Sequence, residues 1–255
     1  MRALVIGDVV GQAGCEFLRR ELPRLKREYS VDLTVVNGEN SAEGNGILPH
    51  SAKAIFDCGA DVITTGNHGL RRREINDLMD RGEGLLRPAN YHPSAHGRGW
   101  YVYDAMAWKA CVINLQGSVY LDTYENPFVC IDRILEQVDT PIILVDLHGE
   151  ATSEKEAMGY YLDGRVSAVF GTHTHVQTAD EQILPKGTAY LSDLGMCGPF
   201  YSVLGVSPEL AIRRLSTGLP TRFENAEGPC ALGGAVIEID EKTGRAKSIF
   251  RVQVR

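Results

Sequence analysis

The chain has 255 residues, of which 44% are hydrophobic and 23% are charged, a composition typical of soluble globular proteins. The formal net charge of −7 argues against stable nucleic-acid binding, which usually needs a basic surface. No apolar run approaches the roughly 20 residues of a membrane span, and the N-terminus does not resemble a secretory signal. We therefore expect one cytoplasmic domain over residues 1–255, with no membrane partner.

The first half of the chain alternates short apolar runs with helical patterns. Strands are predicted at residues 3–6, 33–36 and 62–65, and helices at 15–29, 51–57 and 71–79. This β-α-β-α-β order is typical of a layered α/β core with mainly parallel strands.

The second half is richer in strand patterns. A hairpin is predicted at 100–103 with 110–113, further strands at 141–145, 166–170 and 188–191, and a closing antiparallel pair at 234–239 and 247–252. Helices are predicted at 126–138 and 208–215, and Ser153 with Glu156 predicts a capping box that opens another. So many strands with few intervening helices favour two sheets with helices packed outside, rather than a barrel.

Polar residues that can bind metals follow five of the predicted strands. In open α/β sheets, ligands collect beyond the carboxyl ends of the strands, so these side chains are expected to converge if the strands are parallel neighbours. The residues, in chain order, are Asp8, Glu39, Asn40, Asn67, His68, His148, His173 and His175.

Each of these positions also has a simpler interpretation. Asp8 could cap a turn, the N-G-E-N stretch at 37–40 could be turn chemistry, and His148 could be a hydrogen-bonded core histidine. The H-x-H pair at 173–175 also occurs by chance. The joint pattern at five strand ends nevertheless favours a metal site.

The candidate ligands offer nitrogen and oxygen but no thiolate, which disfavours a structural zinc site. Two carboxylates, two amides and three histidines are too many for one ion. They suit two ions about 3.5–4 Å apart, bridged by a hydroxide and a shared carboxylate, for which Glu39 is the natural choice. The six cysteines form no C-x-x-C pair, so we assign none of them to the chemistry.

In this order the motifs resemble those of the calcineurin-like metallophosphoesterases, and more closely those of their bacterial YmdB-like branch. The matching stretches cover nearly the whole chain. They are G-D-V-V-G at 7–11, N-G-E-N at 37–40, G-N-H at 66–68, H-G-E-A-T-S-E-K at 148–155, G-T-H-T-H-V-Q-T-A-D at 171–180 and I-L-P-K-G-T-A-Y at 183–190.

The resemblance implies an α/β fold, the calcineurin-like four-layer αββα sandwich with two mixed sheets flanked by helices. It also implies a two-metal phosphodiesterase acting on 2′,3′-cyclic nucleotides. The two divalent or mixed-valence metal ions would be iron, with manganese or zinc as alternatives. Carried over to this chain, the first metal takes Asp8, Glu39, Asn40 and His175, and the second takes Glu39, Asn67, His148 and His173.

In the mechanism that this implies, a hydroxide bridging the metals attacks phosphorus and His68 protonates the departing ribose oxygen. Three positions depart from the wider pattern. Val10 stands where the superfamily has a histidine, Glu39 replaces a bridging aspartate, and Gly69-Leu70 stands where the branch often has Thr-Trp.

Further expectations concern residues near the motifs. Asp146 is expected to point away from the metals and is left out of the site, and residues 195–200 are expected to form a loop over the pocket, with Cys197 as a packing thiol. The run Arg71, Arg72 and Arg73 could attract phosphate or form a solvated charged face.

Three alternatives remain open. They are a phosphomonoesterase or protein phosphatase with the same metals, a regulatory RNA-associated protein with weak activity, and a TIM-barrel metal hydrolase. The barrel usually places its H-x-H pair early in the chain, whereas here it lies at 173–175. A homo-oligomer is compatible with the sequence, which leaves the subunit number open.

Overall fold

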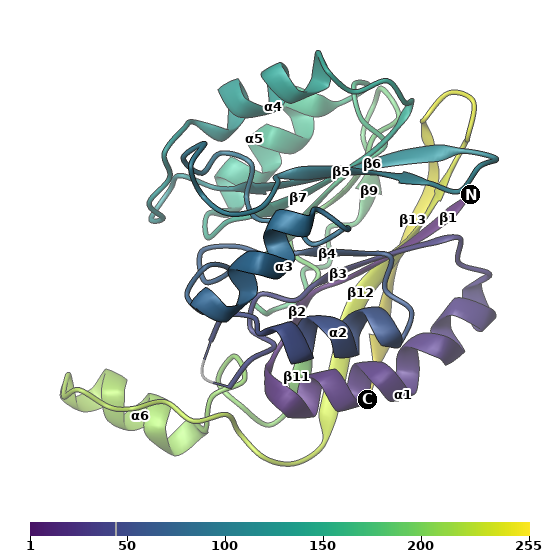
Figure 1. Cartoon of the computed structure of the whole chain (residues 1–255). Helices are drawn as coiled ribbons and strands as arrows, with labels where there is room; N and C mark the ends of the chain where they lie inside the picture. Colours follow the sequence, from purple (N-terminus) through teal and green to yellow (C-terminus); the bar gives the residue numbers. More distant parts are fainter. Residues whose placement is uncertain (44) are drawn as a thin grey trace.

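Two mixed β-sheets lie face to face in the computed structural model, which describes residues 1–43 and 45–255 (Figure 1). The first sheet has the strand order β2-β11-β12-β1-β3-β4, with β13 paired to β12. Its strands are β1 (Arg2–Ile6), β2 (Asp8–Val9), β3 (Leu33–Asn37), β4 (Val62–Thr64), β11 (Met196–Pro199), β12 (Cys230–Ile239) and β13 (Ala246–Val254). Strands β1, β3 and β4 are parallel to one another, as predicted for the first half of the chain.

The second sheet has the order β5-β6-β7-β8-β10-β9. Its strands are β5 (Trp100–Asp104), β6 (Lys109–Gln116), β7 (Ile142–His148), β8 (Ala168–Thr172), β9 (Gln182–Ile183) and β10 (Ala189–Leu191). The predicted hairpin of β5 and β6 is confirmed, and β6, β7 and β8 run parallel. Every residue of β3 and β7 is buried, which explains why these strands are mainly apolar and do not alternate apolar with polar residues along their length.

Helices cover the outer faces of both sheets. On the first sheet lie α1 (Gly11–Tyr29), α2 (Pro49–Asp57) and α3 (Asn76–Arg81), the last preceded by a 3₁₀ turn η1 (Arg73–Ile75). On the second lie α4 (Pro127–Leu135) and α5 (Thr152–Leu162). Among the described residues, no helix is both long enough and apolar enough to cross a membrane.

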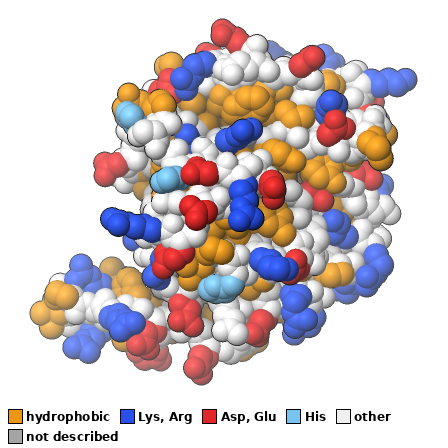
Figure 2. Space-filling model, viewed as in Figure 1, with side chains coloured by type: hydrophobic (Ala, Val, Ile, Leu, Met, Phe, Trp, Pro, Cys, Tyr) orange, Lys and Arg blue, Asp and Glu red, His pale blue; other side chains and the backbone are white. Residues whose placement is uncertain are grey.

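Helix α6 (Pro208–Thr217) projects away from the layers as an arm (Figure 1). The residues just before α6 are held by a β-bridge between Val206 and Asn225 and by a hydrogen bond from the Ser207 N–H to the Glu224 carbonyl oxygen. The surface viewed in Figure 2 carries acidic and basic side chains interspersed, with hydrophobic side chains on the arm. On that face the described side chains form no continuous basic patch, in keeping with the net charge of −7.

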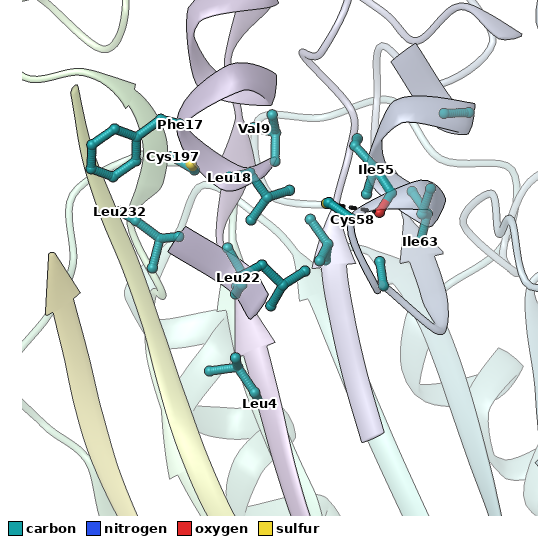
Figure 3. Close-up of a cluster of buried hydrophobic side chains, with 14 of the residues drawn as sticks. Leu4, Val9, Phe17, Leu18, Leu22, Ile55, Cys58, Ile63, Cys197 and Leu232 are labelled. Carbon is teal, nitrogen blue, oxygen red and sulfur yellow. Dashed lines mark hydrogen bonds between the residues drawn. The ribbon is translucent and has the colours of Figure 1, made fainter. Parts of the chain in front are cut away.

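Three apolar clusters hold the layers together. Leu18 and Leu22 of α1 pack with Ile55 of α2 against the first sheet (Figure 3). A second cluster, which includes Val35 and Phe170, fills the space between the sheets, and a third lies between the second sheet and helices α4 and α5. These three interfaces confirm the predicted four-layer αββα sandwich.

The structure corrects three local predictions. The helix predicted from Arg71 begins as a 3₁₀ turn at Arg73 and becomes α-helical at Asn76. The capping box at Ser153 is wrong, because Ala151 is the N-cap of α5 and no side chain caps it. The predicted loop at 195–200 is largely strand β11, which pairs with β12 and with β2.

Candidate metal centre

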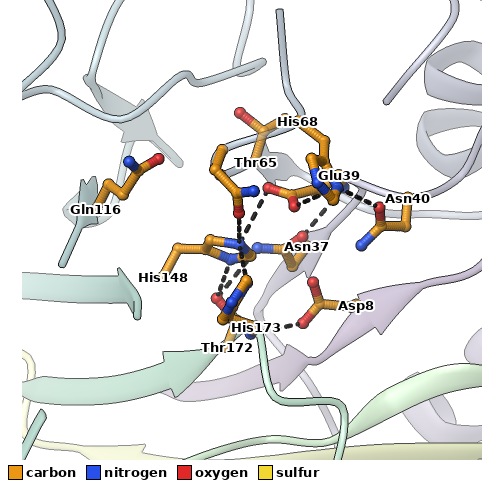
Figure 4. A network of polar contacts seen from close by, with 12 residues as sticks. Asp8, Asn37, Glu39, Asn40, Thr65, His68, Gln116, His148, Thr172 and His173 are labelled. Atoms are coloured by element: carbon orange, nitrogen blue, oxygen red, sulfur yellow. Dashed lines mark hydrogen bonds and ion pairs between the residues drawn. The ribbon is translucent and has the colours of Figure 1, made fainter. Parts of the chain in front are cut away.

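Five strand ends bring the predicted ligands together at one end of the two sheets (Figure 4). The first sheet contributes the residues at and after β2, β3 and β4, and the second contributes those at the ends of β7 and β8. The predicted ligands therefore come from both sheets of the sandwich. The sequence pattern had instead suggested neighbouring strands of one sheet. Asp8 lies in β2 and His148 ends β7, while Glu39, Asn67 and His173 follow their strands.

The predicted second-metal ligands form a close group around His148. Its Nε2 lies 3.1 Å from Glu39 Oε2, 3.1 Å from Asn67 Oδ1 and 3.0 Å from His173 Nδ1. The ligand atoms of Glu39, His148 and His173 all lie within 4.8 Å of one another. One imidazole nitrogen has either one proton or one lone pair, so it can form a hydrogen bond with only one of these three polar groups. A cluster of such groups around one point is the arrangement expected at a cation site.

The predicted first-metal ligands are also neighbours, although less closely grouped. His175 Nε2 lies 3.5 Å from Asp8 Oδ1 and 3.3 Å from Asn40 Nδ2. The amide oxygen of Asn40 instead faces His68 Nδ1 at 3.0 Å. Asn40 could bind a metal through its oxygen only after its amide group turned over.

The two buried carboxylates have oxygens without hydrogen bonds. Among the described residues, Asp8 Oδ1 and both carboxylate oxygens of Glu39 accept none, although both side chains are fully buried. The nearest partners of the two Glu39 oxygens are imidazole nitrogens of His68 and His148, each 3.1 Å away in an ion-pair contact. Because buried unpaired acceptors are costly, these oxygens fit the role of metal ligands.

The electrostatics of the group point in the same direction. Burial would raise the pKa of Glu39, but the adjacent His148 and His68 hold it well below its usual range, so the carboxylate is ionised. Burial would likewise lower the pKa of His148, but Glu39 and Asp8 raise it to about 9. Two buried carboxylates thus demand a nearby positive charge, which a divalent cation would supply more strongly than a proton.

A buried hydrogen-bond network behind His148 was missed from the sequence. His148 Nδ1 lies 2.9 Å from Thr172 Oγ1, and the Thr172 hydroxyl donates to Asp146 Oδ1 at 2.7 Å. Since that hydroxyl proton goes to Asp146, its oxygen accepts from His148 Nδ1–H, which leaves Nε2 free to face Glu39.

The prediction that Asp146 points away was wrong, because residues two apart on a strand share one face. Asp146 is completely buried beneath the site and also accepts from the Asn37 amide and the Thr64 hydroxyl. Burial raises the pKa of Asp146 to about 6. The i, i+2 spacing to His148 was the signal that could have identified it.

The H-x-H loop has an unusual backbone. His173 and His175 have φ values of 100° and 63°, a region that residues other than glycine rarely occupy. Between them, the backbone N–H and hydroxyl of Thr174 both donate to Asp193 Oδ2, which also accepts from Lys155. Such strain persists only when surrounding contacts hold it, and these contacts do so.

Two further contacts orient the histidines of the H-x-H pair. The Leu204 carbonyl oxygen accepts from His175 Nδ1 at 3.0 Å, which directs Nε2 toward Asp8. Glu150 Oε2 lies 3.1 Å from His173 Nε2. In the sequence, only the position of Glu150 in the same 148–155 motif as His148 linked it to the site. Nothing in the sequence linked Leu204 to it.

His68 also lies against Glu39, but it is less buried than His148. Its side chain is 24% exposed, whereas that of His148 is fully buried, and its Nδ1 lies 3.1 Å from Glu39 Oε1. After it, Gly69 is closely packed, since a Cβ there would lie 2.5 Å from Thr65 Oγ1. The departure from the branch pattern at this position therefore matches the local packing.

The three arginines that follow do not act as one group. Arg72 donates to the carbonyl oxygens of Asn45 and Glu43, while Arg71 and Arg73 are exposed. Cys197 is fully buried in β11, as expected for a packing thiol.

Comparison with known proteins places the chain in a family. The family described as YmdB-like protein matches residues 4–252. The chain is 46% identical over 256 residues to a 2′,3′-cyclic-nucleotide 2′-phosphodiesterase of Bacillus subtilis (strain 168), covering 100% of this chain and 97% of that protein.

Two crystal structures have the same fold throughout. A hypothetical protein from Thermus thermophilus superimposes with a TM-score of 0.94 at 37% identity, covering 100% of this chain and 99% of that one. A novel phosphatase from Mycoplasma pneumoniae gives 0.93 at 34% identity, with coverage of 100% and 93%. The strand-end motifs, the αββα sandwich and these similarities agree, and the chain belongs to the YmdB-like family with its calcineurin-like fold.

Proposed function

We propose that this chain is a metal-dependent phosphodiesterase that hydrolyses 2′,3′-cyclic nucleotides. The similarity to the Bacillus subtilis enzyme extends over the whole chain, which supports the substrate class. The structural observation that carries the proposal is the set of buried carboxylate oxygens of Asp8 and Glu39, which accept no hydrogen bond among the described residues and face imidazole nitrogens.

The proposed site holds two cations, with Glu39 shared between them. Asp8, Asn40 and His175 would complete the first set, and Asn67, His148 and His173 the second. We propose iron as the native metal, with manganese or zinc as alternatives, since all three accept nitrogen and oxygen ligands. Bound cations would neutralise the phosphate oxygens and lower the pKa of a bound water to about 7.

His68 is the proposed proton donor. Asn40 Oδ1 and Glu39 Oε1 both lie close to His68 Nδ1, so the second ring nitrogen, Nε2, remains available for the substrate. In the proposed reaction, water adds to phosphorus, the bond from phosphorus to the ribose 2′ oxygen breaks, and His68 gives that oxygen its proton. The product is a nucleoside 3′-phosphate. A positioned acid of this kind typically accelerates a reaction by about 10²–10⁴-fold.

A phosphomonoesterase with the same metal site is the competing function, because the Mycoplasma pneumoniae relative is described as a phosphatase. To separate the two, the protein is loaded with iron(II), manganese or zinc and given 2′,3′-cyclic nucleotides, nucleoside 2′- and 3′-phosphates, and the mono- and bis-esters of p-nitrophenol. We expect cyclic nucleotides to be converted to 3′-nucleotides without release of inorganic phosphate. Hydrolysis of monoesters alone would refute the diesterase. The Glu39→Gln variant serves as the metal-site control.

A further inference from the structure

Two tyrosines in the segment that follows β6 are largely exposed. Tyr120 is 88% exposed and Tyr124 is 64% exposed. Both lie in the segment 117–126, which leaves the end of β6 next to the metal-site strand β7. Gln116 pairs with His148 across these strands, and the Gly117 N–H donates to the His148 carbonyl oxygen at 2.9 Å. The tyrosine segment therefore starts at the edge of the site, where Figure 4 shows Gln116 beside His148.

The segment is held in place at both of its ends. Near its start, the backbone N–H groups of Ser118 and Val119 donate to the buried Glu154 carboxylate. The Gln116 side chain donates to the Asp122 carbonyl oxygen at 2.7 Å. Near its end, the buried Asn90 amide donates to the Glu125 carbonyl oxygen at 3.0 Å. The two tyrosine side chains are thus presented on a fixed backbone.

The backbone at Tyr120 is itself strained. Its φ of 64° lies in the left-handed region, where a bulky side chain is a clear outlier. The side chain gains almost no burial in return, because most of it faces solvent. Strain of this kind concentrates at ligand sites, and an exposed aromatic ring is suited to stacking on another flat ring.

The position of the tyrosines relative to His68 indicates which part of a substrate they would meet. The ring of Tyr124 packs edge-on to His92, with centroids 4.5 Å apart. Next to His92, the Tyr91 hydroxyl donates to the carbonyl oxygen of Gly66, two residues before His68. The tyrosine segment is thus connected through His92 and Tyr91 to the loop that carries His68, the residue proposed to protonate the ribose 2′ oxygen.

Another exposed tyrosine belongs to a different loop. Tyr201 is 70% exposed and belongs to the loop whose Leu204 carbonyl oxygen binds His175. That loop is next to the proposed first metal rather than to the segment that carries His68. The base carried by the ribose whose 2′ oxygen departs is therefore better matched by Tyr120 and Tyr124.

We propose that Tyr120 and Tyr124 form a platform on which the nucleobase of the substrate stacks. This inference rests on the proposed cyclic-nucleotide phosphodiesterase function. Stacking on an aromatic side chain tolerates all bases, and its loss typically weakens binding by about 5- to 150-fold for each base. The platform would accept every 2′,3′-cyclic nucleotide and bind purines more tightly than pyrimidines, because purines offer the larger stacking surface.

The test compares single and double Tyr120→Leu and Tyr124→Leu variants with the matching Tyr→Phe variants. The control is Tyr160→Leu, since Tyr160 is 61% exposed but lies on α5. The substrates are 2′,3′-cyclic AMP, 2′,3′-cyclic CMP and the 2′,3′-cyclic phosphate of methyl ribofuranoside, which has no base. We expect the leucine variants to raise KM for cyclic AMP by about 5- to 150-fold, with a smaller rise for cyclic CMP. The phenylalanine and Tyr160→Leu variants should match the wild type.

The base-free substrate separates the possible failures. If the leucine variants raise its KM as much as that of cyclic AMP, or leave both values unchanged, the platform is refuted while the phosphodiesterase function stands. If the metal-loaded wild type hydrolyses none of the three substrates, the proposed function fails and the platform fails with it. A lower molecular mass of the leucine variants by light scattering, with unaltered KM, would show that the tyrosines serve self-association instead.

Discussion

The Lys155 ammonium lies 2.8 Å from the Asp193 carboxylate, and the two side chains are only 3% and 1% exposed. The same Asp193 oxygen accepts the backbone N–H and the hydroxyl of Thr174, the residue between the two histidines of the H-x-H loop. This buried pair therefore helps to fix the geometry of two proposed metal ligands.

Replacing Lys155 with methionine should destabilise the protein strongly. The change leaves the Asp193 carboxylate buried without its charge partner, and breaking such a pair typically costs about 3–5 kcal/mol. Urea unfolding measures this cost. The matched control is Lys53→Met, which removes an exposed pair with Asp57 and should cost no more than about 1 kcal/mol. Equal costs for the two variants would contradict a structural role for the buried pair.

The Thr172 hydroxyl offers a sharper test of how His148 is oriented. Thr172→Val keeps the shape of the side chain but removes the group between His148 Nδ1 and Asp146. Loss of such an orienting contact typically weakens metal binding by about 10- to 100-fold, which competition with a coloured chelator can measure. Thr172→Ser retains the hydroxyl and should bind nearly as tightly as the wild type. If valine and serine behave alike, the hydroxyl does not fix the ring.

The sequence was informative where chemistry and periodicity coincide. Buried strands such as β3 and β7 are mainly apolar, so the polar residues at and after their ends are conspicuous. It was less informative where a short strand is placed only by its pairing with other strands. Strand β11 has four residues, two of them Gly198 and Pro199, so its place in the sheet depends on partners far along the chain.

The same limit applies within the site. Asp146 could have been found from its spacing to His148, but its link through Thr172 is a tertiary contact between strands β7 and β8. The contribution of Leu204 is a backbone carbonyl oxygen, which any residue could supply, so no side-chain pattern could have identified it.

His68→Ala should separate catalysis from metal binding. His68 is partly exposed and lies beside the ligand group, so the variant should retain its metal content while turnover of cyclic nucleotides falls by about 10²–10⁴-fold. Elemental analysis of the purified variant and initial rates on 2′,3′-cyclic AMP measure the two quantities. Loss of metal with retained turnover would reverse the assignment and make His68 a ligand.

Metal binding should also be visible as stability, because Asp8 and Glu39 place two fully buried carboxylates close to each other. A cation that binds only the folded state at 100 times its Kd adds about 2.7 kcal/mol to the free energy of unfolding. For a chain of this size that corresponds to a rise in Tm of roughly 5–10 °C. Thermal unfolding after treatment with a chelator, and again after adding iron(II), manganese or zinc, measures the difference.

The Glu39→Gln variant completes that experiment. Glutamine has nearly the same size as Glu39 but only one acceptor oxygen and no charge, so it cannot serve as the shared ligand of two cations. We expect the metal-dependent rise in Tm to be mostly lost in this variant. The control is Lys53→Met, because the Lys53 side chain is exposed on α2. In this variant the metal-dependent rise in Tm should equal that of the wild type. A full metal-dependent rise in Glu39→Gln would mean that the buried carboxylate oxygens of Glu39 are not where the cations bind.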